Sequence, residues 1–384
     1  MSTVHHAPCF STSEAVDLAA QLYGLHAAAR PLPSERDQNF HLQTDEGAEY
    51  VLKIAGSAES AEVLDLQNAA IARLHEHDPA RFRLHLYPTR NGESVASVTG
   101  GDGRVHLLRL LNYLPGKPLA EVKPQQPALL YEIGAYLGAL DRALHTFTHR
   151  AAGRELHWDL KQAGQVIRRH LEAIADPVRR ALVESLLADF TCAVEPKLTR
   201  LRTSLIHNDA NDYNIIVTPA RVDQGPAVGG LIDFGDMVHS YTVAEVAIAC
   251  AYVMLGKAEP LAAAAQVVAG YHAEYPLQEE ELALLFPLIQ MRLSMSVALS
   301  AYQQQLNPNN QYLSISEQPA WSLLEQLQHF HPRLAEAIFR QACQLPPCAA
   351  TPAVAAWLRT NAAEFGPVVD LDLRTASAQV VDLS

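Results

Sequence analysis

The sequence predicts a two-lobed α+β fold, with a β-rich N-terminal lobe and a mostly helical C-terminal lobe that holds a small β insert. Strand-like runs separated by turn residues are concentrated in the first third of the chain. Segments with apolar residues at helical spacing fill most of the remainder, and one strand–loop–strand island at residues 205–234 interrupts them. We therefore expect an N-terminal lobe at residues 1–111, a connector at 112–118, a helical lobe at 119–350 and a tail at 351–384.

The composition is that of a soluble globular protein, with 49% hydrophobic and 18% charged residues among 384. The net charge of −13 argues against a broad grip on nucleic acid, which usually needs basic stripes. Five scattered cysteines without a zinc-binding spacing predict reduced thiols. The N-terminus lacks a signal-peptide pattern, and the apolar stretch 243–255 is too short to span a membrane. We expect a cytoplasmic protein that binds neither nucleic acid nor membranes, and its oligomeric state stays open.

The N-terminal third is predicted to form a helix and strands with turns between them. A turn at Asp45-Glu46-Gly47 separates two strand-like runs and predicts a hairpin. The expected elements, in order, are a helix at 12–25, strands at 39–44 and 49–54, a helix at 60–76, and strands at 94–99 and 105–111. A connector punctuated by proline and glycine, NYLPGKPL, then leads out of this lobe.

Long helices are predicted for the rest of the chain, on either side of the β island. Their apolar residues recur at three- and four-residue intervals, which places them on one buried face. The expected helices cover residues 127–147, 159–170, 176–201, 242–255, 260–275, 279–306, 321–331 and 354–365.

The island contains the residues that indicate chemistry. His207-x-Asp209-x4-Asn214 is followed, after a hairpin-like segment, by Asp233-Phe234-Gly235. Transfer of a phosphoryl group to a hydroxyl needs a carboxylate that orients the hydroxyl and takes its proton, and oxygen ligands for metal ions that bridge the phosphates. This order of residues predicts an ATP- and Mg2+-dependent phosphotransferase, with Asp209 as the base and Asn214 and Asp233 as metal ligands. A hairpin whose acidic residues only cap turns is the alternative.

The N-terminal lobe should then supply the other contacts to the nucleotide. Lys53 lies in the run Val51-Leu52-Lys53-Ile54, which is typical of a strand that directs a lysine at the α- and β-phosphates. The segment 32–39 occupies the place of a loop that covers phosphates. It lacks the usual glycines, so Ser34 and neighbouring backbone amides would have to make those contacts; a polar surface turn is the alternative.

Together these motifs resemble the aminoglycoside phosphotransferase and choline kinase-like superfamily, and within it the hydroxylysine kinase-like branch. The resemblance extends over roughly residues 15–345 and is carried by LPSERDQNF, YVLKIA, LDLQNAAIARL, NYLPGKPL, HNDANDYNIIV, LIDFGDM and MRLSMSVALSA. It implies a protein kinase-like fold and assigns Asp209, Asn214, Asp233 and Lys53 the roles given above. It also implies a hinge whose backbone bonds the adenine, at Leu110, Asn112 and Leu114.

The chain departs from the pattern of the superfamily at two helices. The helix after Lys53 usually carries a glutamate that pairs with the lysine; the best-matching position here is Gln67, and Glu62 is a second candidate. The helix after Asp233 carries Glu245 where an aspartate is usual, and we expect it to brace the catalytic loop. The resemblance also implies that the tail is a junction, because members of this branch occur as N-terminal parts of fusions with peptidase-like and aminotransferase-like modules.

An acceptor that bears an amine needs anions or aromatic faces beside it. The candidates for these are Asp212, Asp236 and Glu245, with Tyr241 or Trp321 for the aromatic face. Arg292, in an otherwise apolar helix, would suit a substrate carboxylate, and a structural ion pair is the alternative for it. The acceptor itself stays open among hydroxylysine-, ethanolamine-, choline- and homoserine-like compounds.

Two other functions remain possible from the sequence. A protein serine/threonine kinase of the same superfamily is disfavoured by Asn211, where such kinases commonly have a lysine, and by the lack of an Ala-Pro-Glu segment after Asp233. A nucleotide-binding pseudokinase is disfavoured because the motif is intact, with Lys53, Asp209, Asn214 and Asp233 all present.

Overall fold

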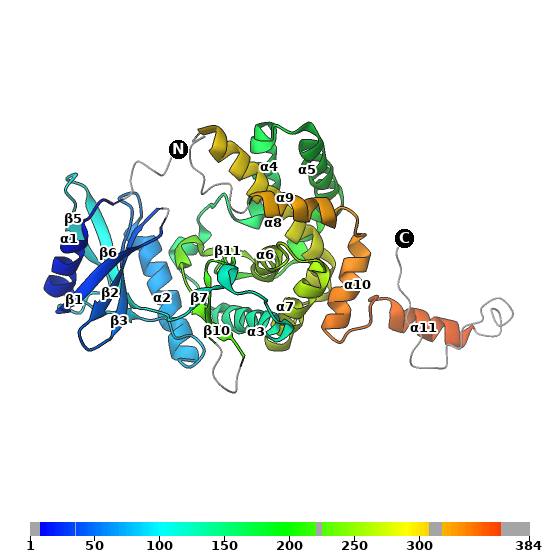
Figure 1. Cartoon of the computed structure of the whole chain (residues 1–384). Helices are drawn as coiled ribbons and strands as arrows, with labels where there is room; N and C mark the ends of the chain where they lie inside the picture. Colours follow the sequence, from blue (N-terminus) through cyan, green and yellow to red (C-terminus); the bar gives the residue numbers. More distant parts are fainter. Residues whose placement is uncertain (1–7, 35, 220–224, 307–316, 362–384) are drawn as a thin grey trace. The chain divides into compact units, whose positions relative to one another are not determined.

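The computed structural model describes residues 8–34, 36–219, 225–306 and 317–361. Glu35, within the segment predicted to cover phosphates, and the part of the predicted tail beyond residue 361 lie outside the described residues. The chain divides into two units (Figure 1). Unit 1 takes its described residues from 1–122, 146–154 and 213–237, and unit 2 takes its own from 123–145, 155–212 and 238–384.

Unit 1 is built on an antiparallel sheet in the order β1-β2-β3-β6-β4, with β5 paired to β6. Its strands are β1 (Ala27–Leu32), β2 (Gln38–Thr44), β3 (Glu49–Ile54), β4 (Leu86–Tyr87), β5 (Ala96–Thr99) and β6 (Val105–Asn112). Alternate residues of the central strands, such as Phe40, Leu52 and Leu110, are buried in one core with α1 (Thr12–Leu18). The β-rich N-terminal lobe is thereby confirmed, including the hairpin at 39–54.

Two strands of this sheet were not predicted. β1 reads AAARPL and its side chains alternate only between intermediate and exposed, so it lacks the apolar signal of a strand. β4 has only two residues, too few for any periodicity. Because β1 ends at Leu32 and β2 begins at Gln38, the segment predicted to cover phosphates is the connection between two antiparallel strands.

A second, three-stranded sheet in unit 1 lies next to Asn214 and Asp233, the two residues predicted to bind metal. It joins β7 (Lys117–Pro118), β9 (Ile215–Thr218) and β10 (Ala227–Leu231) in the order β10-β9-β7. In this sheet, Gly230 of β10 lies close to Leu114 in the connector that follows β6. A Cβ on Gly230 would lie 2.6 Å from Cδ1 of Leu114, and the backbone φ of Gly230 is +151°, so both the space and the conformation favour glycine. The helix α2 (Ala61–His77) completes unit 1 and begins at Ser60, whose hydroxyl accepts a hydrogen bond from the Val63 amide.

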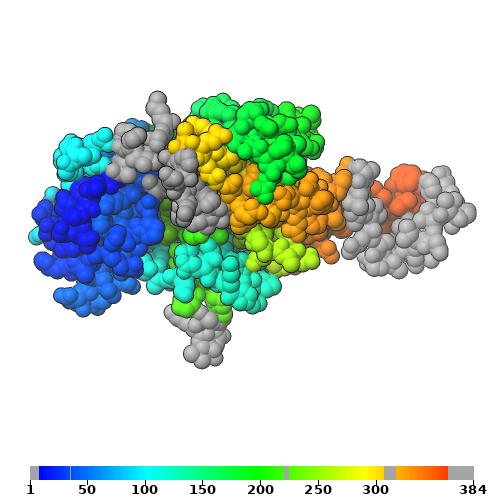
Figure 2. Space-filling view, turned by 45° about the horizontal axis from the view of Figure 1, so that its top comes forward, coloured from blue at the N-terminus to red at the C-terminus, as the bar shows by residue number. Residues whose placement is uncertain are grey.

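Unit 2 is mostly helical, as predicted. Its helices are α3 (Pro127–Leu144), α4 (Ala163–His170), α5 (Pro177–Asp189), α6 (Val243–Val253), α7 (Pro260–Glu274), α8 (Glu279–Leu306), α9 (Glu317–Leu327), α10 (Pro332–Ala342) and α11 (Thr351–Thr360). Figure 2 shows the green α4–α5 region on the surface of this unit beside the yellow end of α8, against which both helices pack. Two short strands of unit 2, β8 (Thr203–Ile206) and β11 (Val238–Tyr241), pair antiparallel. In the sequence, β8 comes just before the motif at residues 207–235 and β11 comes just after it.

The helix predicted at 176–201 is shorter in the structure. α5 ends at Asp189, and the chain continues as a π turn at Phe190–Val194 and a 3-10 segment at Glu195–Arg200. Pro196 lacks the amide hydrogen that would continue the α-helical ladder. α10 was not predicted, because the expected helices end at residue 331 and resume only at residue 354.

The core of unit 2 is formed around α8. Among the described helices, α8 alone is long and apolar enough to cross a membrane by length and composition, and 83% of the residues in its most apolar window are buried within the protein. Its buried face includes Arg292 and Ser294 among the apolar residues. Such burial is that of a core helix.

Glycines permit α3 and α7 to pack with their backbones almost in contact. A Cβ on Gly270 would lie 1.9 Å from the carbonyl oxygen of Tyr131, and one on Gly134 would lie 1.9 Å from that of Val267. These are backbone atoms of the facing helix, so no side-chain rotation relieves the clash. This crossing therefore requires glycine at both positions.

Gly270→Ala is expected to lower the free energy of unfolding by roughly 2 kcal/mol or more, because overpacking forces the two backbones apart. Urea denaturation followed by circular dichroism measures the loss. Gly101→Ala is the control, since nothing lies within 4 Å of its Cβ position. Equal stability of both variants would contradict this packing.

Candidate active site

The loop that carries Asp209 follows β8 and is fixed by buried side chains of unit 2. His207 and Asn208 are fully buried, and Asn208 has a left-handed backbone with φ of 67°. The amide of Asn208 donates to Oε2 of Glu245 at 3.0 Å, and the amide of Asp209 donates to Nδ1 of His207 at 3.3 Å. The expected bracing of this loop by Glu245 is thereby confirmed, and His207 supplies a second contact that holds it.

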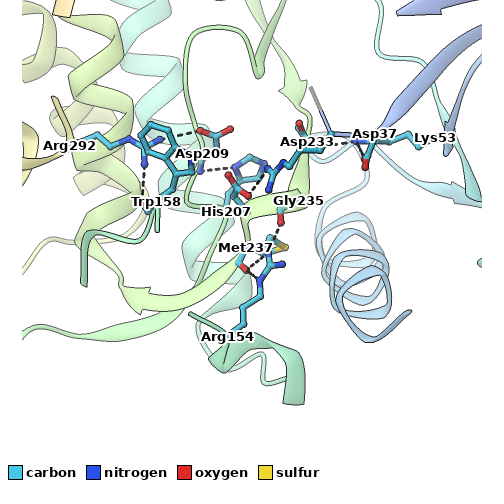
Figure 3. Close-up of polar contacts among 12 residues, drawn as sticks. Asp37, Lys53, Arg154, Trp158, His207, Asp209, Asp233, Gly235, Met237 and Arg292 are labelled. Atoms are coloured by element: carbon cyan, nitrogen blue, oxygen red, sulfur yellow. Dashed lines mark hydrogen bonds and ion pairs between the residues drawn. The ribbon is translucent and has the colours of Figure 1, made fainter. Parts of the chain in front are cut away.

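The carboxylate of Asp209 is in contact with Arg292 of α8. Nη2 of Arg292 donates to Oδ1 of Asp209 at 3.2 Å, and Nη1 donates to the carbonyl oxygen of Trp158 at 3.0 Å (Figure 3). The guanidinium also lies over two aromatic rings, 4.7 Å from the centroid of Trp158 and 5.7 Å from that of Tyr252. The structure thus places Arg292 in an ion pair with the predicted base.

The glutamate beneath the loop belongs to a buried acidic group. Burial raises the pKa of Glu245 to about 7, opposed by hydrogen bonds from the Asn208 and His207 backbone and by the charge of Arg292. Burial and the nearby Glu245 also hold the pKa of Asp141 well above its usual range, although the hydroxyl of Tyr271 donates to Asp141 and opposes the shift. Near neutral pH this group therefore carries protons that solvated carboxyl groups would have lost.

Unit 1 brings Lys53 together with two carboxylates. Nζ of Lys53 lies 3.3 Å from Oδ1 of Asp233 and 3.7 Å from Oδ2 of Asp37 (Figure 3). Asp233 has a left-handed backbone, with φ of 62°, and lies two residues after β10. Next to it, the Ile232 amide donates to the carbonyl oxygen of Asn214 at 3.0 Å, which joins the end of β10 to the start of β9. The half-exposed Asp233 carboxylate is therefore paired with Lys53 just beyond the end of β10.

Two arginines of unit 1 stabilise the turn after Asp233 through an ion pair and hydrogen bonds. Nη2 of Arg36 pairs with Oδ1 of Asp236 at 2.7 Å. Arg154 donates to the carbonyl oxygens of Gly235 and Met237 (Figure 3). Arg36 thus holds the turn through the Asp236 side chain and Arg154 holds it through the backbone, and the Asp233 side chain stays half-exposed.

The prediction that Gln67 or Glu62 of α2 pairs with Lys53 was wrong. The side-chain oxygen of Gln67 accepts from Nη2 of Arg109, and Asn68 accepts from Nη1 at 2.6 Å. Glu62, the second candidate, pairs with Arg150 at 3.3 Å. Arg109 lies opposite Lys53 on the neighbouring strand and donates to the side-chain oxygen of Gln67. Lys53 pairs with the carboxylates of Asp37 and Asp233 instead.

The predicted hinge begins inside the sheet. Leu110 lies between β3 and β4 within the ladder, and Asn112 uses its side chain to accept from the His85 amide at 2.8 Å and to donate to the Arg83 carbonyl at 3.0 Å. The Tyr113 amide donates to the Glu49 carbonyl at 3.1 Å. Leu114 is the first residue beyond this ladder, and the assignment of the adenine contact to the segment stays a prediction.

Four of the five candidate contacts to an ammonium are already paired or buried in the structure. The carboxylate of Asp236 is already neutralised by Arg36, and the ring of Tyr241 lies 5.4 Å from Nζ of Lys161. Trp321 is buried, with Arg179 over its ring, and Glu245 is fully buried beneath the loop. Asp212 remains: it is partly buried, and burial raises its pKa to about 6 against the charge of Lys123.

Comparison with known proteins identifies the family. Residues 28–282 match the model of the phosphotransferase enzyme family. The chain belongs to this family. It is 33% identical to hydroxylysine kinase of Mus musculus over 351 residues, covering 86% of this chain and 93% of the relative, and 34% identical to that of Bos taurus over 343 residues, covering 83% and 90%. The phosphotransferase is accordingly a small-molecule kinase.

Solved structures agree on the fold. An amicoumacin kinase in complex with AMP-PNP and Ca2+ has a TM-score of 0.62 at 17% identity, covering 83% of this chain and 94% of that one. A microcompartment-associated aminopropanol kinase has a TM-score of 0.63 at 15% identity, covering 87% and 99%. At these identities the likeness establishes the kinase-like fold alone, which confirms the predicted fold class.

Several polar residues of the site were missed in the sequence. Asp37 and Arg154 meet Asp233 and its turn only through the tertiary fold, and Trp158 and Tyr252 flank Arg292 from two other segments. A signal was available for Asp37, which stands inside the quoted motif LPSERDQNF. No local pattern marks Trp158 or Tyr252.

The raised pKa of Glu245 predicts a pH dependence of stability in this phosphotransferase. An acid whose pKa rises from 4.5 to about 7 on folding stabilises the fold below pH 4.5, and this contribution is lost as the pH rises through 7. Glu245→Gln keeps an acceptor for the Asn208 amide but does not titrate. Between pH 5 and 8 the variant should therefore lose less unfolding free energy than the wild type, by on the order of 3 kcal/mol in urea denaturation. The exposed Glu280→Gln should behave as wild type, and a Glu245→Gln curve parallel to wild type would refute the assignment.

Proposed function

We propose that this phosphotransferase moves the γ-phosphate of Mg-ATP to the hydroxyl of hydroxylysine or a closely similar amino acid. The observation that carries the proposal is the pair of acidic positions in the motif: Asp209 held by Arg292 in unit 2, and Asp233 held by Lys53 in unit 1. A reaction with little covalent chemistry for the protein needs positioned charges of this kind. The hydroxylysine kinases at 33–34% identity supply the acceptor.

Residues of unit 1 are assigned to the nucleotide. Lys53 would bind phosphate oxygens, and Asp233 with Asn214 would hold Mg2+. Magnesium is commonly held by one or two protein oxygens together with phosphates, and the side chains of Asp233 and Asn214 offer oxygens of that kind. When bound, the ion would offset the charge that develops on the phosphates. The AMP-PNP and Ca2+ bound by the amicoumacin kinase support this assignment.

Residues of unit 2 are assigned to the acceptor. Asp209, with its side chain 21% exposed, would orient the acceptor hydroxyl and take its proton as the oxygen attacks phosphorus. The loop beneath it is fixed by Glu245 and His207, which limits the positions that the carboxylate can reach. Asp212, three residues on, is the candidate partner for the ammonium of the acceptor.

Asp209→Asn is expected to lower the turnover number by at least ~100-fold and to change the Kd for ATP by no more than a few-fold, because the carboxylate faces the acceptor. An ADP-coupled assay and calorimetric titration of ATP measure the two quantities. Asp189→Asn, at the end of α5, is the control and should be neutral. More than about a tenth of wild-type turnover in Asp209→Asn would contradict its role as the base.

The acceptor class is tested by 31P nuclear magnetic resonance of the product. With ATP, Mg2+ and hydroxylysine, a phosphate monoester should appear in step with ADP. Norleucine derivatives hydroxylated at the same carbon, which lack the side-chain ammonium, should lose at least ~10-fold in kcat/KM, because a buried partner would be left unpaired. Equal turnover of the two compounds, or transfer only to neutral sugars or to a protein serine, would refute the proposed acceptor.

A further inference from the structure

Arg292 is a fully enclosed cation in the apolar helix α8, with only 2% of its surface exposed. Its neighbours on that helix, Met291 and Leu293, are buried apolar residues. A guanidinium is costly to bury unless its charge and donors are matched. The contact that matches its charge is the ion pair to Asp209, 83 residues away in the sequence.

The guanidinium is fixed from three directions before it reaches Asp209. Nη1 donates to the carbonyl oxygen of Trp158, and the guanidinium also lies over the rings of Trp158 and Tyr252. The donors of an arginine form a rigid planar fork, so anchoring one nitrogen and the plane also sets the direction of the other. Nη2 therefore meets Oδ1 of Asp209 along one direction, and a lysine could not make both contacts with that geometry.

Asp209 is restrained correspondingly at two points. Its amide donates to Nδ1 of His207, which fixes the backbone, and Arg292 holds one carboxylate oxygen. We propose that Arg292 is the positioning residue that fixes the orientation of the Asp209 carboxylate for proton acceptance. The proposal rests on the function proposed above, in which Asp209 is the base. It assigns Arg292 to the enzyme's own carboxylate, in place of the carboxylate of a substrate.

A substrate-binding role is disfavoured by the same contacts. A carboxylate of the acceptor would have to displace Asp209 or the Trp158 carbonyl from a side chain that is 2% exposed. The two roles also differ in kinetics. Loss of a substrate contact raises the KM for the acceptor, whereas misplacement of the base lowers kcat and leaves KM nearly unchanged.

Arg340 offers a matched control for the loss of a buried arginine in unit 2. It lies on α10, is also 2% exposed, and pairs with Glu279 and with the carbonyl oxygen of Pro346. Arg340→Met should destabilise the fold as Arg292→Met does, without a contact to Asp209. A difference in turnover between the two variants therefore reports on Asp209 and not on general stability.

The test compares Arg292→Met, Arg292→Lys and Arg340→Met in steady-state assays with ATP and the acceptor that wild type phosphorylates. Arg292→Met should lose about 100-fold in kcat, since misplacement of a reacting group by about 1 Å costs that much. Its KM values for ATP and acceptor should stay within about 3-fold. Arg292→Lys, which keeps the charge but not the fork, should retain more turnover than Arg292→Met, and Arg340→Met should keep wild-type kcat at the assay temperature.

Three results would overturn the inference: wild-type kcat in Arg292→Met, an equal fall of kcat in Arg292→Met and Arg340→Met, or a rise confined to the acceptor KM. If Arg292→Met does not fold, wild-type kcat in Arg292→Lys overturns it equally. Asp209→Asn separates this inference from the proposed function. An inactive Asp209→Asn beside a fully active Arg292→Met refutes only the positioning role, whereas an active Asp209→Asn refutes the base itself and the inference with it.

Discussion

The constraint on which the site depends is electrostatic: each carboxylate proposed for the chemistry is paired with a cation of the protein and held in place by it. Lys53 holds Asp233, and Arg292 holds Asp209. Neither cation is close in sequence to its partner, since the separations are 180 and 83 residues. Tertiary contacts within each unit therefore position its acidic residue, and this links the packing of the sheet and of α8 to the proposed chemistry.

The structure also shows how the site differs from the pattern of its superfamily at α2. A glutamate on this helix would pair with the strand lysine, but Gln67 is neutral and bonds Arg109. Burial lowers the pKa of Arg109, and the carboxylates of Asp37 and Asp233 oppose that shift. The acidic partners of Lys53 thus also favour the charged state of the buried arginine opposite it. One group of charges replaces the single ion pair expected from the resemblance.

Local spacing was sufficient to predict much of this arrangement. The turn at Asp45-Glu46-Gly47 between two strand-like runs predicted the central hairpin, and the order of Asp209, Asn214 and Asp233 indicated the chemistry. Contacts between residues far apart in the sequence were not predictable in this way. Arg292 had two open interpretations because its helix shows only that an arginine is buried among apolar residues, and nothing local marks Asp209 as its partner.

The central claim is that Asp233, held ready by Lys53, is the protein's ligand for the metal that accompanies ATP. Calorimetric titration of ATP into wild type and Asp233→Ala, each with Mg2+ and with EDTA, tests it most directly. Mg2+ should strengthen ATP binding to wild type by at least ~10-fold, and Asp233→Ala should lose this gain. Equal affinity of wild type for ATP with Mg2+ and with EDTA, or an undiminished gain in Asp233→Ala, would show that Asp233 is not the metal ligand.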